Sequence, residues 1–250
     1  YTELGQHADF LGICSPAQML ATFFINDTFN TGDWRLKRHA ESEFWKWLAS
    51  WAACISKPSD IGFPDEGYEL PPLNLQTITV DVDQSESAGD DLFRIATLSA
   101  TTMHREMRMT SAARSDEVAK LVSESEEPWI VWCNTNDEAD ALTSRIEDAI
   151  EVRGSDTPEK KQRLLADFSE GRARVIITKP SIAGFGLNWQ HCRNVAFVGL
   201  SYSFEDFYQA LRRSYRFGQT KQVNAYVIQA QTEGAISRVI QTKIKQHEEM

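Results

Sequence analysis

A cluster of arginines near the carboxyl end of the chain has the strongest chemical character in the sequence. The stretch 209–222 carries Arg212, Arg213, Arg216 and Lys221 and no acidic residue, whereas the whole chain has a formal net charge of -10 at pH 7. The guanidinium group is planar and can form two parallel hydrogen bonds with a phosphate or a carboxylate. The stretch is therefore a candidate site for an anionic ligand.

Helical spacing would hold these groups in a fixed arrangement. If residues 204–219 form a helix, Gln209, Arg213 and Arg216 are spaced i, i+4 and i+7 and project from one face. The opposite face is apolar and would pack on a core; it consists of Phe204, Phe207, Tyr208, Leu211 and Tyr215. Such a fork is suited to binding a polyphosphate during phosphoryl transfer. The alternative is a solvated cationic last turn that the helix dipole favours.

Short apolar runs rich in β-formers must position this segment. They cover 129–133, 174–178, 194–200 and 223–228, and helical or loop segments separate them. This pattern predicts βαβ units on a parallel sheet, and hence an α/β fold class with a compact lobe. Within the lobe, we expect a helix with Thr157 as N-cap, Pro158 at its first position and Gly171 at its carboxyl end.

The amino-terminal half has a different character. Residues 36–55 place apolar side chains at helical spacing, and we interpret the aromatic ones as core rather than as a platform for bases. A connection with Pro and Gly follows over 57–72, then an alternating strand over 75–82 and an acidic linker. We predict a division into a mainly helical segment with a linker, 1–90, and the parallel-sheet lobe, 91–250.

Composition narrows the class of protein. No apolar stretch approaches the roughly 18 residues that span a bilayer, so we expect no membrane partner. No secretory signal is visible after Tyr1, which is not an initiator Met, so we expect an internal fragment of a cytoplasmic protein.

The four cysteines, at positions 14, 54, 133 and 192, lack metal-ligand spacing, which favours reduced thiols and no metal site. The acidic balance argues against nucleic-acid binding by a broadly basic surface, so any such contact would be local.

Four segments, in order, resemble motifs of the Swi/Snf-like ATPases of helicase superfamily two. QALRRSYRFGQ at 209–219 resembles motif VI, and ITKPSIAGFGLNW at 177–189 resembles motif V. PWIVWCNTNDEADAL at 128–142 resembles motif IV, and the segment 153–171 resembles the stretch between motifs IV and V. The resemblance implies a second RecA-like motor lobe, preceded over 1–90 by the end of a first lobe, a helical insertion and a linker. The tryptophan-rich helix beside the linker is similar to those of phage or prophage members, which implies a bacterial or phage-infected cell.

The resemblance also implies nucleotide-binding roles. Arg213 and Arg216 would act as arginine fingers on the γ-phosphate of ATP, and Gln209 would orient them. The other implied positions lie in motif V: Gly184, Gly186 and Asn188. The glycines would allow a close backbone approach, and the asparagine would tie the loop to the nucleotide side. The alternative for the glycines is a tight turn without a ligand.

Nucleic-acid contacts are implied at two places, with DNA favoured over RNA. In motif V, the hydroxyls of Thr178 and Ser181 would meet phosphates of one strand. In motif IV, Thr135 and Asn136 would contact a phosphate at a helix N-terminus, although plain helix caps are the alternative. Lys179-Pro180 departs from the usual motif V pattern and could alter the loop.

The chain lacks the parts that hold the triphosphate in such a motor. No glycine begins a G-x-x-x-x-G-K-[ST] loop. The string Asp137-Glu138-Ala139-Asp140 spells a DEAD box, but we place it in the first turn of a helix whose apolar stripe continues through Ile150. ATP and Mg²⁺ would therefore be held mainly by the first RecA-like lobe of the same protein. We expect this chain alone not to hydrolyse ATP.

Two other classes of function stay open at this point. A non-catalytic nucleic-acid or protein-binding module could keep the fold without the partner lobe. A Rossmann-type transferase could use AGFGLN as its cofactor turn, but that class needs an acidic residue at the end of the next strand, where the sequence has Ser201 and Ser203 with Glu205 later.

Overall fold

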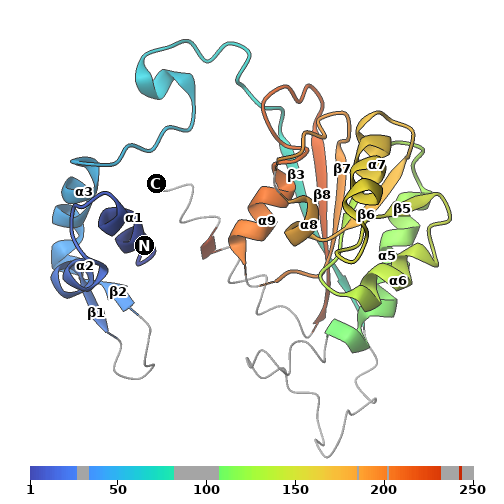
Figure 1. The fold of residues 1–250 in the computed structure, drawn as a ribbon, viewed down its shortest axis with the longest axis horizontal. Helices are drawn as coiled ribbons and strands as arrows, with labels where there is room; N and C mark the ends of the chain where they lie inside the picture. The colour runs from blue at the N-terminus through green and yellow to red at the C-terminus, as the bar shows by residue number, and fades with distance from the viewer. Residues whose placement is uncertain (27–33, 82–106, 185, 202, 232–241, 244–250) are drawn as a thin grey trace, which may run out of the picture. The chain divides into compact units, whose positions relative to one another are not determined.

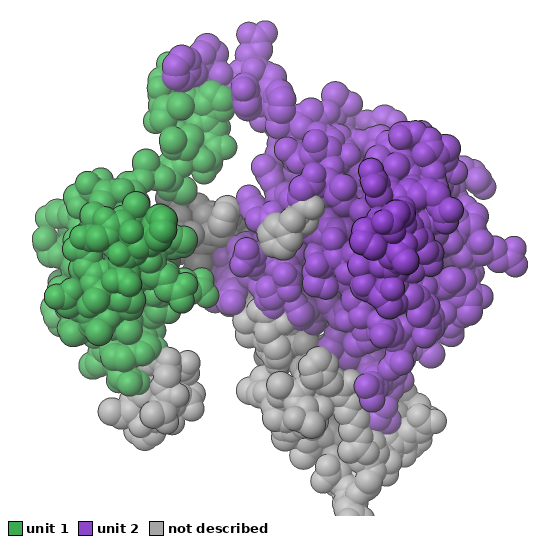
Figure 2. All heavy atoms as spheres, in the orientation of Figure 1, with its two compact units in different colours: residues 1–62 green, residues 63–250 purple. Residues whose placement is uncertain are grey.

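The computed structural model describes residues 1–26, 34–81, 107–184, 186–201, 203–231 and 242–243. Contacts within the chain divide it into two compact units, Tyr1–Gly62 and Phe63–Met250, which Figure 2 colours separately. Throughout these ranges, every helix is too short or too polar to cross a lipid bilayer.

In the first unit, short helices accompany a two-stranded antiparallel sheet. Its elements are α1 (Leu4–Phe10), α2 (Pro16–Phe23), β1 (Phe24–Asn26), β2 (Trp34–Leu36), η1 (Arg38–Ala40), α3 (Glu41–Ala49) and η2 (Pro58–Ile61). A capping box begins α2: the Ser15 hydroxyl accepts from the Gln18 N–H, and the Gln18 side chain accepts from the Ser15 N–H. This capping box fixes the amino-terminal end of α2 with local hydrogen bonds.

An aromatic cluster forms the core of the first unit. Phe44 is fully buried, and its ring centroid lies 5.4 Å from that of Phe23 and 5.8 Å from that of Trp47. The interpretation of the aromatic stripe as core is therefore confirmed for this helix. The helix is shorter than predicted, because α3 ends at Ala49, where the Ser50 hydroxyl donates to the Trp47 carbonyl, and Ile55 is exposed.

The second unit is built on a six-stranded parallel sheet, visible in Figure 1. Its elements are β3 (Leu73–Val80), α5 (Ser111–Ser123), β4 (Trp129–Trp132), α6 (Asn136–Thr143), β5 (Ala149–Glu151), α7 (Pro158–Ser169), β6 (Val175–Thr178), α8 (Pro180–Ala183), β7 (Asn194–Val198), α9 (Phe204–Leu211) and β8 (Val223–Ala230). The strand order is β3-β8-β7-β4-β6-β5, and every pairing is parallel. The predicted α/β class with a parallel-sheet lobe is confirmed.

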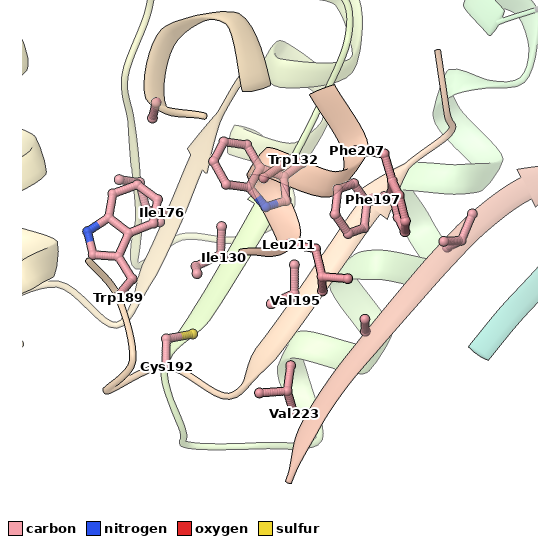
Figure 3. Packing of buried hydrophobic residues seen from close by; sticks show 14 of the residues in the cluster. Ile130, Trp132, Ile176, Trp189, Cys192, Val195, Phe197, Phe207, Leu211 and Val223 are labelled. Atoms are coloured by element: carbon pink, nitrogen blue, oxygen red, sulfur yellow. The ribbon is translucent and has the colours of Figure 1, made fainter. Parts of the chain in front are cut away.

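Each face of the sheet has its own apolar core, because alternate strand residues point to opposite sides. Ile130 and Trp132 of β4 pack on the face that α7 and α9 cover, together with Phe168 and Phe207. Figure 3 shows Trp132 on this face beside Phe197 and Phe207. The other face holds Val131 of β4 and the apolar residues of α5 and α6.

The strand β3 belongs to the second unit, not to the amino-terminal part. It pairs with β8 along its whole length, from Leu73 opposite Val223 to Val80 opposite Ala230. The predicted boundary at 90/91 lies outside the described residues, whereas the contacts divide the chain at Gly62. The alternating pattern predicts the strand but not its partner, because β8 is distant in the sequence.

The sequence predicted the two ends of α7 but not the carboxyl end of α6. Thr157 caps α7 by accepting from the Lys160 N–H at 3.3 Å, and Gly171 has a positive φ of 73°, as predicted. The helix predicted through Ile150 is wrong: α6 ends at Thr143, and residues 149–151 form the edge strand β5, paired with β6. Apolar spacing over so short a strand is also compatible with a helix, so the pattern alone could not separate them.

A buried ion pair joins α5 to the start of α6. Arg114 Nη1 lies 2.8 Å from Glu138 Oε1, and both side chains are fully buried. Glu138 Oε2 accepts from the backbone N–H groups of Asn134 and Thr135, at 2.7 and 3.0 Å. Gly199 has a positive φ of 77°, and a Cβ there would lie 2.5 Å from Arg114 Nη1, so the position favours glycine. We call this arrangement the α5–α6 junction; it makes Glu138 of the DEAD string a structural residue.

Candidate functional site

The arginines that the sequence marks as chemically active lie just beyond α9. The Ser203 hydroxyl caps this helix by accepting from the Asp206 N–H at 3.1 Å, and Phe207 and Leu211 are buried against the sheet. The helix ends at Leu211, so Arg213 and Arg216 lie in the turns that follow, not on one continuous helix as predicted. We call residues 212–219 the arginine segment.

The Arg213 side chain ends α9 by bonding to a backbone carbonyl that the next helical turn would use. The Gln209 carbonyl, which would accept from the Arg213 N–H in a continuing helix, accepts instead from Arg213 Nε at 3.0 Å. The Arg213 N–H bonds to the Ala210 carbonyl at 3.2 Å, and the Trp189 N–H takes the Arg213 carbonyl at 2.8 Å. The predicted pairing of Gln209 with Arg213 nevertheless holds, since Arg213 Nη2 donates to Gln209 Oε1 at 3.1 Å.

Arg213 is nearly buried, with 7% of its surface exposed. Besides its contacts with Gln209, it donates from Nη1 to the Leu187 carbonyl at 3.0 Å. No ion pair to a carboxylate involves Arg213 among the residues that the structure describes. Burial lowers the pKa of its guanidinium, and the neighbouring charges of Arg216 and Arg212 lower it further. The positive charge is thus held by carbonyl and amide oxygens without neutralisation.

Arg216 is more accessible than Arg213. It is only partly buried, and its Nη1 donates to Asn188 Oδ1. Over the described ranges it also has no carboxylate partner. The structure therefore brings together four of the residues that the sequence nominated, Gln209, Arg213, Arg216 and Asn188, in one cluster that is rich in donors.

The two glycines of the turn before this cluster are required by the backbone. The Gly184 N–H bonds to the Pro180 carbonyl at 2.7 Å, and a Cβ at Gly184 would lie 2.3 Å from that oxygen. Gly186 has a positive φ of 77°, which other residues rarely adopt. These positions shape the loop that delivers the Leu187 carbonyl and Asn188 to the arginines.

Polar side chains form hydrogen bonds between the arginine segment and residues 189–192. The sequence did not predict these contacts. Gln219 Nε2 donates to the Gln190 carbonyl at 3.0 Å, and Gln190 Nε2 donates to the Phe217 carbonyl at 3.1 Å. The Ser214 hydroxyl donates to the Cys192 carbonyl. Gln219, the last residue of the segment that resembles motif VI, is the one sequence signal that could have indicated the contact with residues 189–192.

Thr178 does not offer its hydroxyl at a surface. The residue is 1% exposed, and its Oγ1 donates to the Val152 carbonyl at 3.2 Å. The predicted contact with nucleic acid is therefore wrong for this side chain, which ties β6 to the end of β5 instead. The sequence could not show this, because the partner is a backbone carbonyl of a neighbouring strand.

The remaining candidates lie at the carboxyl ends of β4 and β6, which are adjacent strands. Thr135 caps α6 by accepting from the Glu138 N–H at 3.2 Å, as the alternative interpretation held. Asn136 and Ser181 are exposed, and Asn136 Oδ1 accepts from Lys179 Nζ at 2.7 Å. Lys179, a departure from the usual motif V pattern, places a cation beside these groups.

Acidic residues near this surface are paired. Asp137, at the start of α6, lies 3.2 Å from Arg108 Nε, and Glu138 pairs with Arg114. Within the described part of the chain, no group of three or more His, Cys, Asp or Glu side chains is placed to hold a metal ion. The cluster offers cations for an anion, but it does not offer the carboxylates that Mg²⁺ prefers.

The part of the chain that contains this site is similar to known proteins. Residues 113–218 match the family model of the helicase conserved C-terminal domain. The matched range contains the α5–α6 junction, the glycine turn, Arg213 and Arg216. No curated protein matches the chain.

Solved structures similar to the chain include part of an ATPase domain and two DEAD-box proteins. The C-terminal part of the Fun30 ATPase domain has a TM-score of 0.47 and 24% identity, over 51% of this chain and 45% of that one. The C-terminal domain of the DEAD-box protein Dbp5 has a TM-score of 0.46 and 20% identity, over 53% and 79%. A DEAD box protein from the hyperthermophile Methanococcus jannaschii has a TM-score of 0.46 and 21% identity, over 53% and 37%. The match thus spans less than half of the Fun30 and M. jannaschii chains.

Proposed function

We propose that this chain supplies the second motor lobe of an ATP-dependent DNA helicase or translocase. The observation that carries the proposal is that Arg213 and Arg216 of the arginine segment have no carboxylate partner among the residues that the structure describes. Positive charge that the protein leaves unneutralised is available to an anionic ligand such as a triphosphate. The match of residues 113–218 to the helicase C-terminal domain supports the same assignment.

The two arginines have different roles in this proposal. Arg216, the more accessible, contacts the γ-phosphate of ATP and stabilises charge that develops during phosphoryl transfer. Arg213, whose guanidinium is occupied by Gln209 and the Leu187 carbonyl, positions the segment. Asn188 orients Arg216, and Gly184 and Gly186 form the turn that presents Asn188. ATP and Mg²⁺ are held mainly by the first RecA-like lobe of the same protein.

Nucleic acid binds at the carboxyl ends of β4 and β6. Ser181 and Asn136 contact phosphates of one strand, and Lys179 adds the positive charge; Thr135 fixes the start of α6. Thr178 supports the loop from inside the sheet. DNA is preferred over RNA on the strength of the motif resemblance. Because these local contacts neutralise few phosphates, the affinity for nucleic acid should fall only modestly as salt rises.

The test is ATP hydrolysis by the complete protein with no nucleic acid, with double-stranded DNA and with RNA. We expect DNA to stimulate turnover more than RNA, and the 250-residue chain alone to be inactive. Lys179→Ala should raise the DNA concentration that gives half-maximal stimulation, whereas Lys46→Ala, which changes an exposed lysine paired with Glu43, should not. Turnover that neither nucleic acid changes would contradict the proposal.

A further inference from the structure

We infer that Tyr68 is a positioning residue for Arg216, acting through an aromatic stack that fastens residues 63–72 to the arginine segment. The inference rests on the proposed function, because it concerns how Arg216 is presented. The residues 63–72 belong to the same compact unit as the sheet. They lead into β3, and therefore connect the lobe to the chain that precedes it.

The contact is a stacked pair of rings. The centroids of Tyr68 and Phe217 lie 4.6 Å apart, with 23° between the ring planes. Each residue is about half exposed, at 54% and 52%, so the pair lies on the surface and is not part of the sheet cores. Phe217 directly follows Arg216 in the chain, so holding its ring restricts the backbone that carries the arginine.

The backbone on both sides of the stack is restrained. The Tyr68 N–H bonds to the Asp65 carbonyl at 2.8 Å, and Gly67 beside it has a positive φ of 81°. On the other side, the Phe217 carbonyl accepts from Gln190 Nε2 at 3.1 Å, and Gly218 has a positive φ of 91°. Two turns that need glycine therefore present the rings to each other, and a displacement of one turn is transmitted to the other.

Arg216 depends on this contact more than Arg213 does. Within the ranges that the structure describes, the Arg213 side chain makes three hydrogen bonds, to Gln209 and Leu187, whereas the Arg216 side chain makes one, to Asn188. The Gln219 N–H holds the Arg216 carbonyl at 3.0 Å, and the stack of Tyr68 on Phe217 restrains the next residue along the chain. Loss of the Tyr68 ring should thus misplace Arg216 and leave Arg213 in position.

The first test measures ATP turnover by the complete protein. Tyr68→Ala should lower kcat about tenfold with an unchanged KM for ATP, because an aromatic pair contributes on that scale and no contact with bound ATP is removed. Tyr68→Phe, which keeps the ring, should retain the rate. Phe63→Ala is the matched control, since Phe63 is exposed in the same stretch and has no ring contact within the described residues.

The second test measures hydrogen exchange of the amides in the arginine segment of the 250-residue chain. Tyr68→Ala should speed their exchange relative to Phe63→Ala. Unchanged exchange and an unchanged kcat in Tyr68→Ala would overturn the inference. If Arg216→Ala lowers kcat and Tyr68→Ala does not, the proposed function stands and the inference fails. If Arg216→Ala leaves kcat unchanged, the proposed function fails, and with it the assignment of Tyr68 as a positioning residue for catalysis.

Discussion

Two regions of the sheet lobe each bury an arginine, and they treat its charge differently. In the α5–α6 junction, the fully buried Arg114 is neutralised by Glu138 at 2.8 Å. In the arginine segment, the guanidinium of the 7% exposed Arg213 bonds, within the described part of the chain, to the carbonyls of Gln209 and Leu187 and to the Gln209 amide oxygen. Both guanidiniums have hydrogen-bond acceptors, but among the described residues only that of Arg114 has a counter-charge.

The difference separates a structural arginine from one in a binding site. A buried charge without a partner is costly, so a purely structural site is expected to include a carboxylate. The arginine segment omits one and places the partly exposed Arg216 beside the buried charge. This arrangement leaves a positive field that an anionic ligand would neutralise, which is the physical basis of the assignment to ATP.

The largest expected effect on stability comes from breaking the neutralised pair. Arg114→Met leaves Glu138 buried without its partner and should reduce the free energy of unfolding by about 3–5 kcal/mol. Arg172→Met is the control, because Arg172 pairs with Asp167 at the surface and the loss of an exposed ion pair should change the free energy of unfolding far less. Urea denaturation of the 250-residue chain measures both. Equal losses in the two variants would remove the distinction between the regions.

A smaller loss is expected in the arginine segment. Arg213→Met removes hydrogen bonds to carbonyl and amide oxygens but leaves no carboxylate unpaired, so the free energy of unfolding should fall by about 1–3 kcal/mol. It also removes a charge that burial disfavours. The same denaturation experiment provides the measurement. A loss as large as that of Arg114→Met would mean that Arg213 is primarily a structural residue.

The smallest expected effect is a change in the alkylation of two buried cysteines, Cys133 near the α5–α6 junction and Cys192 near the arginine segment. Burial raises the pKa of Cys133, which directly follows β4 and precedes the α5–α6 junction residue Asn134, to about 12, and it raises the pKa of Cys192, whose carbonyl accepts from Ser214 of the arginine segment, to about 12 as well. At about pH 8 both should therefore resist alkylation, while the exposed Cys54 reacts. Mass spectrometry locates the modified residue. Arg213→Met should expose Cys192 and not Cys133, and equal labelling of the two would contradict this.

Much of the fold was predictable from local patterns. The four runs of β-formers became β4, β6, β7 and β8 because each is a short apolar stretch that the sheet buries on both sides. The Thr157 cap and Gly171 also lie where predicted, since helix ends are set by neighbouring residues.

Features that depend on distant partners were not predictable. The end of α9 at Leu211 follows from Arg213 Nε taking the Gln209 carbonyl, supported by contacts with Leu187 and Trp189. The burial of Thr178 depends on the carbonyl of Val152. Sequence spacing grouped Gln209, Arg213 and Arg216 correctly, but it could not assign different environments to the two arginines.

The most direct test of the central claim is the steady-state ATPase rate of the complete protein carrying Arg216→Ala, measured with saturating DNA beside Arg172→Ala. An arginine that contacts the transferred phosphate should, when removed, lower kcat by on the order of 10³-fold, and Arg172→Ala should behave as wild type. A kcat for Arg216→Ala equal to that of the control would contradict the claim that the unneutralised arginines serve ATP hydrolysis.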